Sequence, residues 1–413
     1  MQGEGYVARI GDLILLGGGT EAVPIIQRAR ELGHRAVVVD GDISCAMRDM
    51  ADTFVHVSCY HGDQAIAVLR ASGLHFDGVL CCAVDAPVAA AEVAAAFELP
   101  GLSVEAARLS SYKYEQKLAL QSVGIPVPFF SHPHDDGTWD IPVSRGVVLK
   151  PNDSRGGRGV VRVLPGVALQ LAYDTAVQYS PAKSVIAEEW LDGPQLSTES
   201  IVQDGRVLFT AAGLRNYSRL DEFAPFVTED GFNEPFVNPF WPERDLYYEI
   251  SKTIQDACRA LGWYQQGAGT VKGDLVIHDG RVYVIELAAR LSGGFFATHG
   301  HVLAYGVDFV GAAIQAALGC TLDEPKPHVR QFVSQRYVFP TPEDIGKTIV
   351  GLPDVSRLDG FCTWGWRAGR IVEAVTCHPS RWGQAMATGH TPDEAREKAD
   401  ALVREMRSGV VLQ

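Results

Sequence analysis

A strand, a glycine-rich loop and a second strand follow one another over residues 147–163, and this stretch constrains the fold more than any other. It reads VVLKPNDSRGGRGVVRV. A Walker A loop carries its lysine directly before a helix, whereas a strand follows here, so that class of site is excluded. Glycines lack a Cβ and let backbone N–H groups approach a ligand closely. We therefore predict a hairpin that covers phosphate groups, with Lys150 as its cation and Gly156, Gly157 and Gly159 in its loop.

The first hundred residues alternate apolar, strand-like runs with helical patterns. Strand-like runs occupy 13–16, 36–39 and 79–82, and helical patterns occupy 25–32 and 88–97. This alternation predicts a parallel, doubly wound α/β domain.

The turn after the first predicted strand is rich in glycine. Gly17-x-Gly19-x-x-Ala22, with Asp40 at the end of the second strand, is loosely similar to the dinucleotide-binding fingerprint. An NAD(P)-dependent oxidoreductase is therefore one alternative function.

Composition narrows the class of partner. The formal net charge is −14 and the pI is near 5.3, which argues against a surface for nucleic acid or an anionic membrane. The 8 cysteines form no C-x-x-C pair, and no run of about 18 uncharged apolar residues occurs. We expect a cytoplasmic protein with small-molecule partners.

A strand that runs into a turn at residues 185–193 reads VIAEEWLDG. The lysine-bearing strand, the glycine loop and this segment, in this order, resemble the ATP-grasp family. In that family the strand and loop form a lid over ATP, and a short hinge holds adenine. The resemblance implies that the phosphates contact Lys113 and Lys150. It also implies that adenine and ribose lie against Glu188, the backbone of Glu189 to Leu191, and Gln195, which stands where many members have glutamate.

Residues 273–287 predict a β-hairpin, and its turn decides which side chains share a face. In a three-residue loop at 278–280, with Gly280 left-handed, Asp274 would pair with Val284 and share a face with Glu286. A two-residue turn at 279–280 would instead put the two carboxylates on opposite faces. We predict the three-residue loop.

Two carboxylates on one face suit a magnesium ion that takes its other ligands from nucleotide phosphates. We therefore expect Asp274 and Glu286 to bind Mg²⁺, with Mn²⁺ as an alternative ion. The family commonly has asparagine where this chain has Ala288.

The segment from Glu286 to Arg290 reads ELAAR. It resembles the E-x-A-A-R form of L-amino-acid (dipeptide) ligases within the ATP-grasp superfamily. That resemblance implies that Arg290 is catalytic and binds the transferred phosphate or a substrate carboxylate. A guanidinium group, planar and always charged, suits both tasks.

The resemblance covers nearly the whole chain and implies a multidomain α/β and α+β architecture. We expect an N-terminal α/β pre-ATP-grasp domain (1–108), a lid (109–200), a central metal- and substrate-binding subdomain (201–322) and a small C-terminal domain (323–413). A helix is predicted over 112–123, with Ser110 or Ser111 as its N-cap and Gly124 after its end. A terminal helix should begin at Thr391 and end at Gly409.

The implied function is that of an ATP- and magnesium-dependent carboxylate–amine ligase, which forms an acyl phosphate, joins it to an amine and releases ADP and phosphate. Amino acids or peptides are the expected substrates, and a homodimer is a family-level expectation. Because Gln195 and Ala288 depart from the common pattern, an ATP-binding protein with altered catalysis is a second alternative. Arg215, Tyr217, His299 and His301 are candidate substrate contacts, and the sequence does not choose among them.

Overall fold

The computed structural model describes residues 11–133, 140–141, 146–164, 168–237, 244–328 and 331–413. The N-terminal domain contains a four-stranded sheet in the order β3-β2-β1-β4, and all its strand pairs are parallel, as predicted. Its strands are β1 (Asp12–Leu16), β2 (Arg35–Asp40), β3 (Thr53–His56) and β4 (Phe76–Cys81), and its helices are α1 (Val23–Glu31), α2 (Gly62–Ala71), α3 (Pro87–Ala96) and α4 (Val104–Arg108).

Both faces of this sheet are covered, as a doubly wound fold requires. Leu13 and Leu15 of β1 belong to a hydrophobic core that includes α1 and α9 (Phe309–Ala317). Ile14 and Leu16 point to the other side, into a core with α2 and α3. Successive residues of a strand face opposite sides, so a continuous apolar strand is what two covered faces need.

The lid contains a small sheet of its own, in the order β5-β8-β6-β7. Helix α6 packs on this sheet and shares a separate core with it. The elements are β5 (Phe130–Ser131), β6 (Val147–Pro151), β7 (Val161–Val163), α6 (Leu169–Gln178) and β8 (Val185–Glu189). Strands β6 and β7 are antiparallel neighbours, which confirms the predicted strand, loop and strand. Part of the polar loop between β5 and β6 lies outside the described residues.

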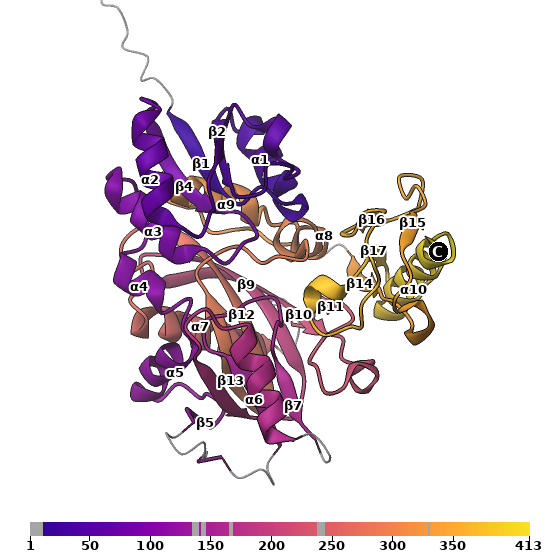
Figure 1. Ribbon diagram of the computed structural model, residues 1–413. Helices are drawn as coiled ribbons and strands as arrows, with labels where there is room; N and C mark the ends of the chain where they lie inside the picture. The colour runs from indigo at the N-terminus through magenta and orange to yellow at the C-terminus, as the bar shows by residue number, and fades with distance from the viewer. Residues whose placement is uncertain (1–10, 134–139, 142–145, 165–167, 238–243, 329–330) are drawn as a thin grey trace, which may run out of the picture.

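An eight-stranded antiparallel sheet forms the centre of the molecule, in the order β13-β12-β9-β10-β11-β14-β17-β16. It continues without a break into the C-terminal segment, so the boundary expected near residue 322 separates helices and loops but not sheets (Figure 1). Its strands are β9 (Gln195–Gln203), β10 (Arg206–Arg215), β11 (Phe232–Glu234), β12 (Ala268–His278), β13 (Arg281–Ala288), β14 (Phe332–Val338), β16 (Phe361–Trp364) and β17 (Gly383–Gly389).

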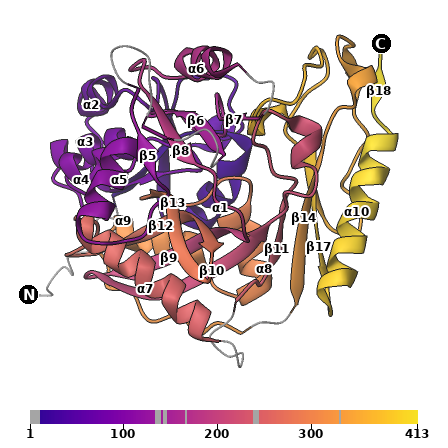
Figure 2. The same ribbon diagram turned by 90° about the horizontal axis from the view of Figure 1, so that it is seen from below.

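Helix α9 packs between this sheet and the N-terminal sheet, whereas the terminal helix lies on its outer side. Figure 2 shows the terminal helix α10 (Pro392–Ser408) lying along β14 and β17. Thr391 caps α10 by accepting from Glu394 N, and Gly409 ends it, as predicted. The remaining elements are α5 (Lys113–Ser122), α7 (Arg244–Ala260), α8 (His301–Tyr305), β15 (Ile349–Gly351) and β18 (Val411–Leu412).

Helix α5 confirms the predicted helix, but its expected N-cap is wrong. The residue before the helix is Tyr112, whose side chain makes no capping hydrogen bond. Ser110 Oγ instead accepts from Ala289 N at 2.9 Å and ties the linker to the central sheet. Gly124 follows the helix with φ +81°, the left-handed conformation expected of that position.

Candidate active site

One cavity of about 940 Å³ lies where the N-terminal domain, the lid, the central sheet and the C-terminal segment meet. Every predicted site residue except Gly159 lines it: Lys113, Lys150, Gly156, Gly157, Glu188, Glu189, Leu191, Gln195, Asp274, Glu286 and Arg290. The fold therefore collects residues that are separated by up to 177 positions (290 − 113) around one space.

A buried cluster of two lysines and a glutamate lies under the lid end of the cavity. Lys150 Nζ is 2.7 Å from Glu188 Oε2, and Lys117 Nζ is 3.4 Å from Glu188 Oε1. Burial alone would raise the pKa of Glu188, but Lys117 and Lys150 outweigh it and lower that pKa. The Glu188 carboxylate therefore binds both lysines and orients Lys150.

Sequence reading missed Lys117. Its Nζ also donates to Ile285 O at 2.7 Å, and burial lowers its pKa to about 8 despite the nearby Glu188. The available signal was its spacing, because Lys117 follows Lys113 by four residues on the predicted helix and so shares its face.

Two glycines of the loop between β6 and β7 have a left-handed backbone conformation. Gly156 and Gly157 have φ +65° and +68°, values that L side chains rarely adopt. Lys113 Nζ donates to Ser154 O at 2.7 Å, and His378 N donates to Gly156 O at 3.1 Å. The loop is therefore held between helix α5 and the C-terminal segment.

The β12–β13 hairpin does not have the predicted three-residue loop. His278 pairs with Arg281 across a two-residue turn, in which Asp279 and Gly280 have φ +48° and +72°. These positive φ values at Asp-Gly are typical of a type I′ hairpin turn. The loop prediction is wrong because it overrode this local preference.

A β-bulge nevertheless brings the two carboxylates together. Leu275 pairs with Val284, and the register then shifts so that Asp274 pairs directly with Glu286. Ile285 is the extra residue and has no cross-strand partner. Asp274 and Glu286 therefore share a face, as predicted, but through a bulge and not through the turn.

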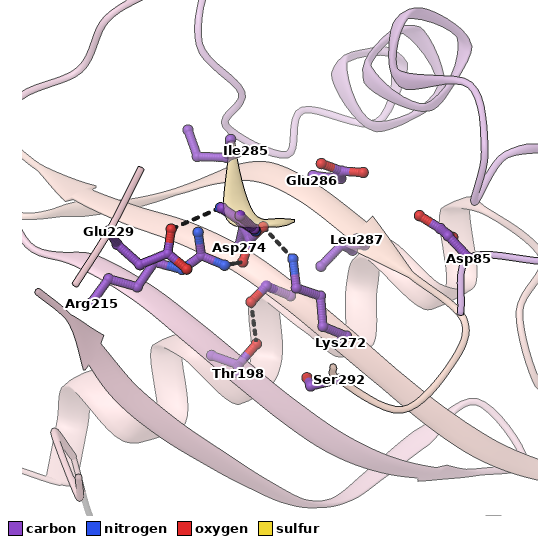
Figure 3. A network of polar contacts seen from close by, with 12 residues as sticks. Asp85, Thr198, Arg215, Glu229, Lys272, Asp274, Ile285, Glu286, Leu287 and Ser292 are labelled. Atoms are coloured by element: carbon purple, nitrogen blue, oxygen red, sulfur yellow. Dashed lines mark hydrogen bonds and ion pairs between the residues drawn. The ribbon is translucent and has the colours of Figure 1, made fainter. Parts of the chain in front are cut away.

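Positive side chains lie near both carboxylates, and Figure 3 shows those that contact Asp274. Asp274 contacts Arg215 through Oδ1 and Lys272 through Oδ2. Glu286 Oε1 is 3.3 Å from Lys113 Nζ. Burial would raise the pKa of Glu286, but Lys113 and the lysines near it lower that pKa to about 2. Glu286 stays ionised at any physiological pH.

The donor set fits a magnesium ion only in part. Among the described residues, no three His, Cys, Asp or Glu side chains come together as a metal site. Glu286 is engaged at Oε1 by one lysine, whereas both oxygens of Asp274 already contact cations. An ion at Glu286 would need phosphate oxygens to complete its shell, which is common for Mg²⁺.

Arg290 lies between the central sheet and the N-terminal domain. Its Nε is 3.5 Å from Asp85 Oδ1, and its Nη1 donates to Leu291 O at 3.0 Å. Burial would lower the pKa of Arg290, but Asp85 outweighs it and the pKa is raised. Asp85 comes from the loop after β4, and sequence reading did not single it out.

The C-terminal segment contributes to a second group of charged residues that lines the cavity. Glu229 is 2.8 Å from Arg381 Nη2 and 2.9 Å from His378 Nε2. Burial would raise the pKa of Glu229, but Arg381 and His378 hold it well below its usual range. No sequence motif indicated these three residues, because Glu229 lies about 150 residues before the segment that carries both His378 and Arg381.

The four candidate substrate contacts divide into two pairs. Arg215 and Tyr217 line the cavity. His301 is fully buried against Glu234, and the His299 ring lies 3.9 Å from the Phe361 ring, between centroids. Neither histidine is among the residues that line the cavity.

In the glycine turn after β1, a backbone N–H group is hydrogen-bonded to the carboxylate at the end of β2. Gly18 N donates to Asp40 Oδ2 at 2.6 Å, so the N–H and the carboxylate that would serve a dinucleotide bind each other. A Cβ at Gly17 would lie 2.6 Å from Val84. Close packing explains Gly17, whereas a Cβ at Gly19 would meet nothing within 4 Å. Gly19, Thr20 and Glu21 line the shared cavity.

Solved structures of known proteins are similar to nearly the whole chain. An L-amino acid ligase from Bacillus licheniformis superposes with a TM-score of 0.74 at 21% identity, covering 98% of each chain. The chain has the ATP-grasp fold. A phosphoribosylglycinamide synthetase from Anaerococcus prevotii gives a TM-score of 0.72 at 17% identity, over 98% of this chain and 100% of that one. The fold predicted from the motifs is confirmed.

Sequence comparison also finds a ligase that is similar to this chain. A D-alanine–D-alanine ligase from Aromatoleum aromaticum is 23% identical over 295 residues, which is 70% of this chain and 88% of that protein. No protein-family model matches the chain. No helix in the described residues is long and apolar enough to span a membrane.

Proposed function

We propose that this ATP-grasp chain is an ATP- and magnesium-dependent ligase that converts a carboxylate into an acyl phosphate and joins it to an amine. The observation that carries the proposal is the ring of cations around Glu286. Lys113 contacts this carboxylate. Lys272, Lys150 and Arg290 also lower the pKa of Glu286 by their positive charge. A group of four cations beside one carboxylate is suited to a polyphosphate.

The hinge at Glu189 to Leu191 indicates how a nucleotide would lie in the cavity. Glu189 and Leu191 line its lid end, and the cation ring lies beyond them. An adenine at the hinge would place its phosphates over Lys150 and under the Gly156–Gly157 loop. A Staphylococcus aureus N5-carboxyaminoimidazole synthetase of the same fold was solved with ADP, which supports a nucleotide in this chain as well.

Magnesium, when bound at Glu286 with nucleotide phosphates, would neutralise charge on the transferred phosphoryl group. The chain's own residues would bind the phosphates, position the reacting groups and exclude water. Lys113 and Lys150 hold the phosphates, and Arg290 holds the transferred group or the reacting carboxylate. The glycine loop excludes water, which would otherwise hydrolyse the acyl phosphate.

Amino acids are the substrates we propose. The far end of the cavity carries both signs of charge, with Arg215 and Arg381 among its cations and Glu21 and Asp85 among its carboxylates. A zwitterion needs both, because its carboxylate and ammonium groups each seek an opposite charge. The named relatives that join amino acids point the same way.

The test is a screen for ADP release over pairs of amino acids and other carboxylates, with product masses recorded. We expect at least one pair to stimulate ADP release and to give a mass equal to the sum of the pair minus water. If ATP binds and no pair stimulates release, an ATP-binding protein without ligase activity replaces this proposal.

The dinucleotide alternative has a simple test of its own, which is an NADH fluorescence titration. The Gly18–Asp40 hydrogen bond leads us to expect no enhancement.

A further inference from the structure

Lys272 is one of the four cations around Glu286, and no sequence motif pointed to it. Strand β12 pairs it directly with Ala288 and places it two residues before Asp274, which pairs with Glu286. Side chains of paired residues, and of residues two apart on a strand, share a face. Lys272, Asp274, Glu286 and Ala288 therefore form a square on one face of the β12–β13 hairpin.

The four corners of this square differ in what they can offer a metal ion. Ala288 has no ligand atom, and its methyl group leaves room for the long side chain opposite. Lys272 Nζ contacts Asp274 Oδ2, and Arg215 contacts Asp274 Oδ1 (Figure 3). Only Glu286 is engaged by a single cation, Lys113, and at a single oxygen.

The ammonium group of Lys272 has access to the cavity. Its side chain is 12% exposed, and both Lys272 and Asp274 line the same space as Lys150 and Arg290. A lysine ammonium is a compact point charge with three donors, so one can remain on Asp274 while others meet phosphate oxygens.

We propose that the Lys272 ammonium is a built-in second cation of the phosphoryl-transfer site, in the position where a second divalent ion would otherwise bind Asp274. The chain then needs one divalent ion, held by Glu286 and the nucleotide. This inference rests on the proposed function. Its consequence is a site in which Lys272 touches the reacting phosphates and is a catalytic residue.

Counting bound ions tests the inference without relying on turnover. Mn²⁺ is titrated into the protein in the presence of adenylyl imidodiphosphate, a non-hydrolysable ATP analogue, and bound Mn²⁺ per chain is measured by electron paramagnetic resonance. We expect one ion in the wild type. Lys272→Met keeps the side-chain length and releases Asp274 Oδ2, so we expect a second ion to bind and turnover to fall on the order of a hundredfold.

Lys252→Met is the matched control. Lys252 also forms an ion pair with an aspartate, Asp256, but it lies on α7 with a 73% exposed side chain. We expect one ion and wild-type turnover. If Lys272→Met does not fold, as judged by thermal unfolding, Lys272→Gln replaces it, because the amide can still donate to Asp274 without carrying charge.

Two ions in the wild type would overturn the inference, and so would an unchanged count in the Lys272 variant. A chain that binds no nucleotide analogue would overturn the proposed function as well. Nucleotide binding with two ions would leave the proposed function intact.

Discussion

Replacing Glu286 with glutamine removes the single negative charge at the centre of the cation ring. The side chain keeps its shape, and Lys113 loses its partner at 3.3 Å. Lys272, Lys150 and Arg290 keep their other carboxylate partners, but each loses the attraction of the Glu286 charge. We expect the unliganded protein to become less stable.

The magnitude follows from the pKa of Glu286. The surrounding lysines lower it from 4.5 to about 2. At about 1.4 kcal/mol for each pKa unit, this corresponds to roughly 3 kcal/mol of folding free energy at pH 7. It is an upper figure, because the side chain is 23% exposed to solvent.

The sign of the pH dependence is also determined. Because the folded-state pKa is lowered, the unfolded chain binds more protons between the two values, and stability rises with pH there. The contribution of Glu286 is complete above about pH 5, is lost as pH falls through 2, and has dropped to about half near pH 3. The wild type and the variant should converge on acidification.

The assay is urea unfolding followed by tryptophan fluorescence, at pH 7 and at the lowest pH at which both proteins fold. Glu31→Gln is the control, because Glu31 forms an exposed pair with Arg28 and should cost under about 1 kcal/mol. A Glu286→Gln variant as stable as the wild type at pH 7, or a difference that does not shrink with falling pH, would refute the charge-balance argument.

Three further predictions concern the lid and the linker. Lys150→Met should abolish tight ATP binding in a calorimetric titration, because it removes the cation that Glu188 orients; unchanged affinity would contradict the phosphate role. Gly157→Val should weaken ATP binding while global stability falls by about 1 kcal/mol, since φ is +68° and an added Cβ would meet the His378 ring at 3.1 Å; wild-type affinity would show that the loop does not cover the nucleotide. Trp263→Phe should lose about 1–3 kcal/mol of unfolding free energy and leave nucleotide affinity unchanged, because the buried indole donates to Ala106 O at 2.8 Å; a stability equal to that of the wild type would sink this reading.

Local signals predicted most of the elements around the site. Alternating apolar runs indicated the parallel N-terminal sheet, and glycines indicated the lid loop, because strand burial and positive φ are properties of a few adjacent residues. The β12–β13 hairpin marks where such reasoning ended. Its Asp-Gly turn was legible from the sequence, whereas the bulge at Ile285 was not, since a bulge depends on how the whole sheet twists and packs.

The charged partners of the site were beyond local reasoning altogether. Asp85, Glu229 and Arg381 come from loops that the chain brings together only after three domains have packed. Their pairing depends on distances between segments more than a hundred residues apart, and Coulomb energy in a buried site changes steeply over a few ångströms.

The cation ring around Glu286 shows which features the sequence determines and which the tertiary structure decides. The amino-acid sequence alone determined that Lys113, Lys150, Glu286 and Arg290 belong to strands, helices and turns of the ATP-grasp type, because periodicity and turn chemistry are local. Lys272 shares a face with Asp274 because it lies two residues away on the same strand, whereas tertiary structure alone decided that Asp274 faces Arg215 and pairs with Glu286. A one-residue shift of register moves a side chain to the other face of a sheet, and only the packed sheet sets that register.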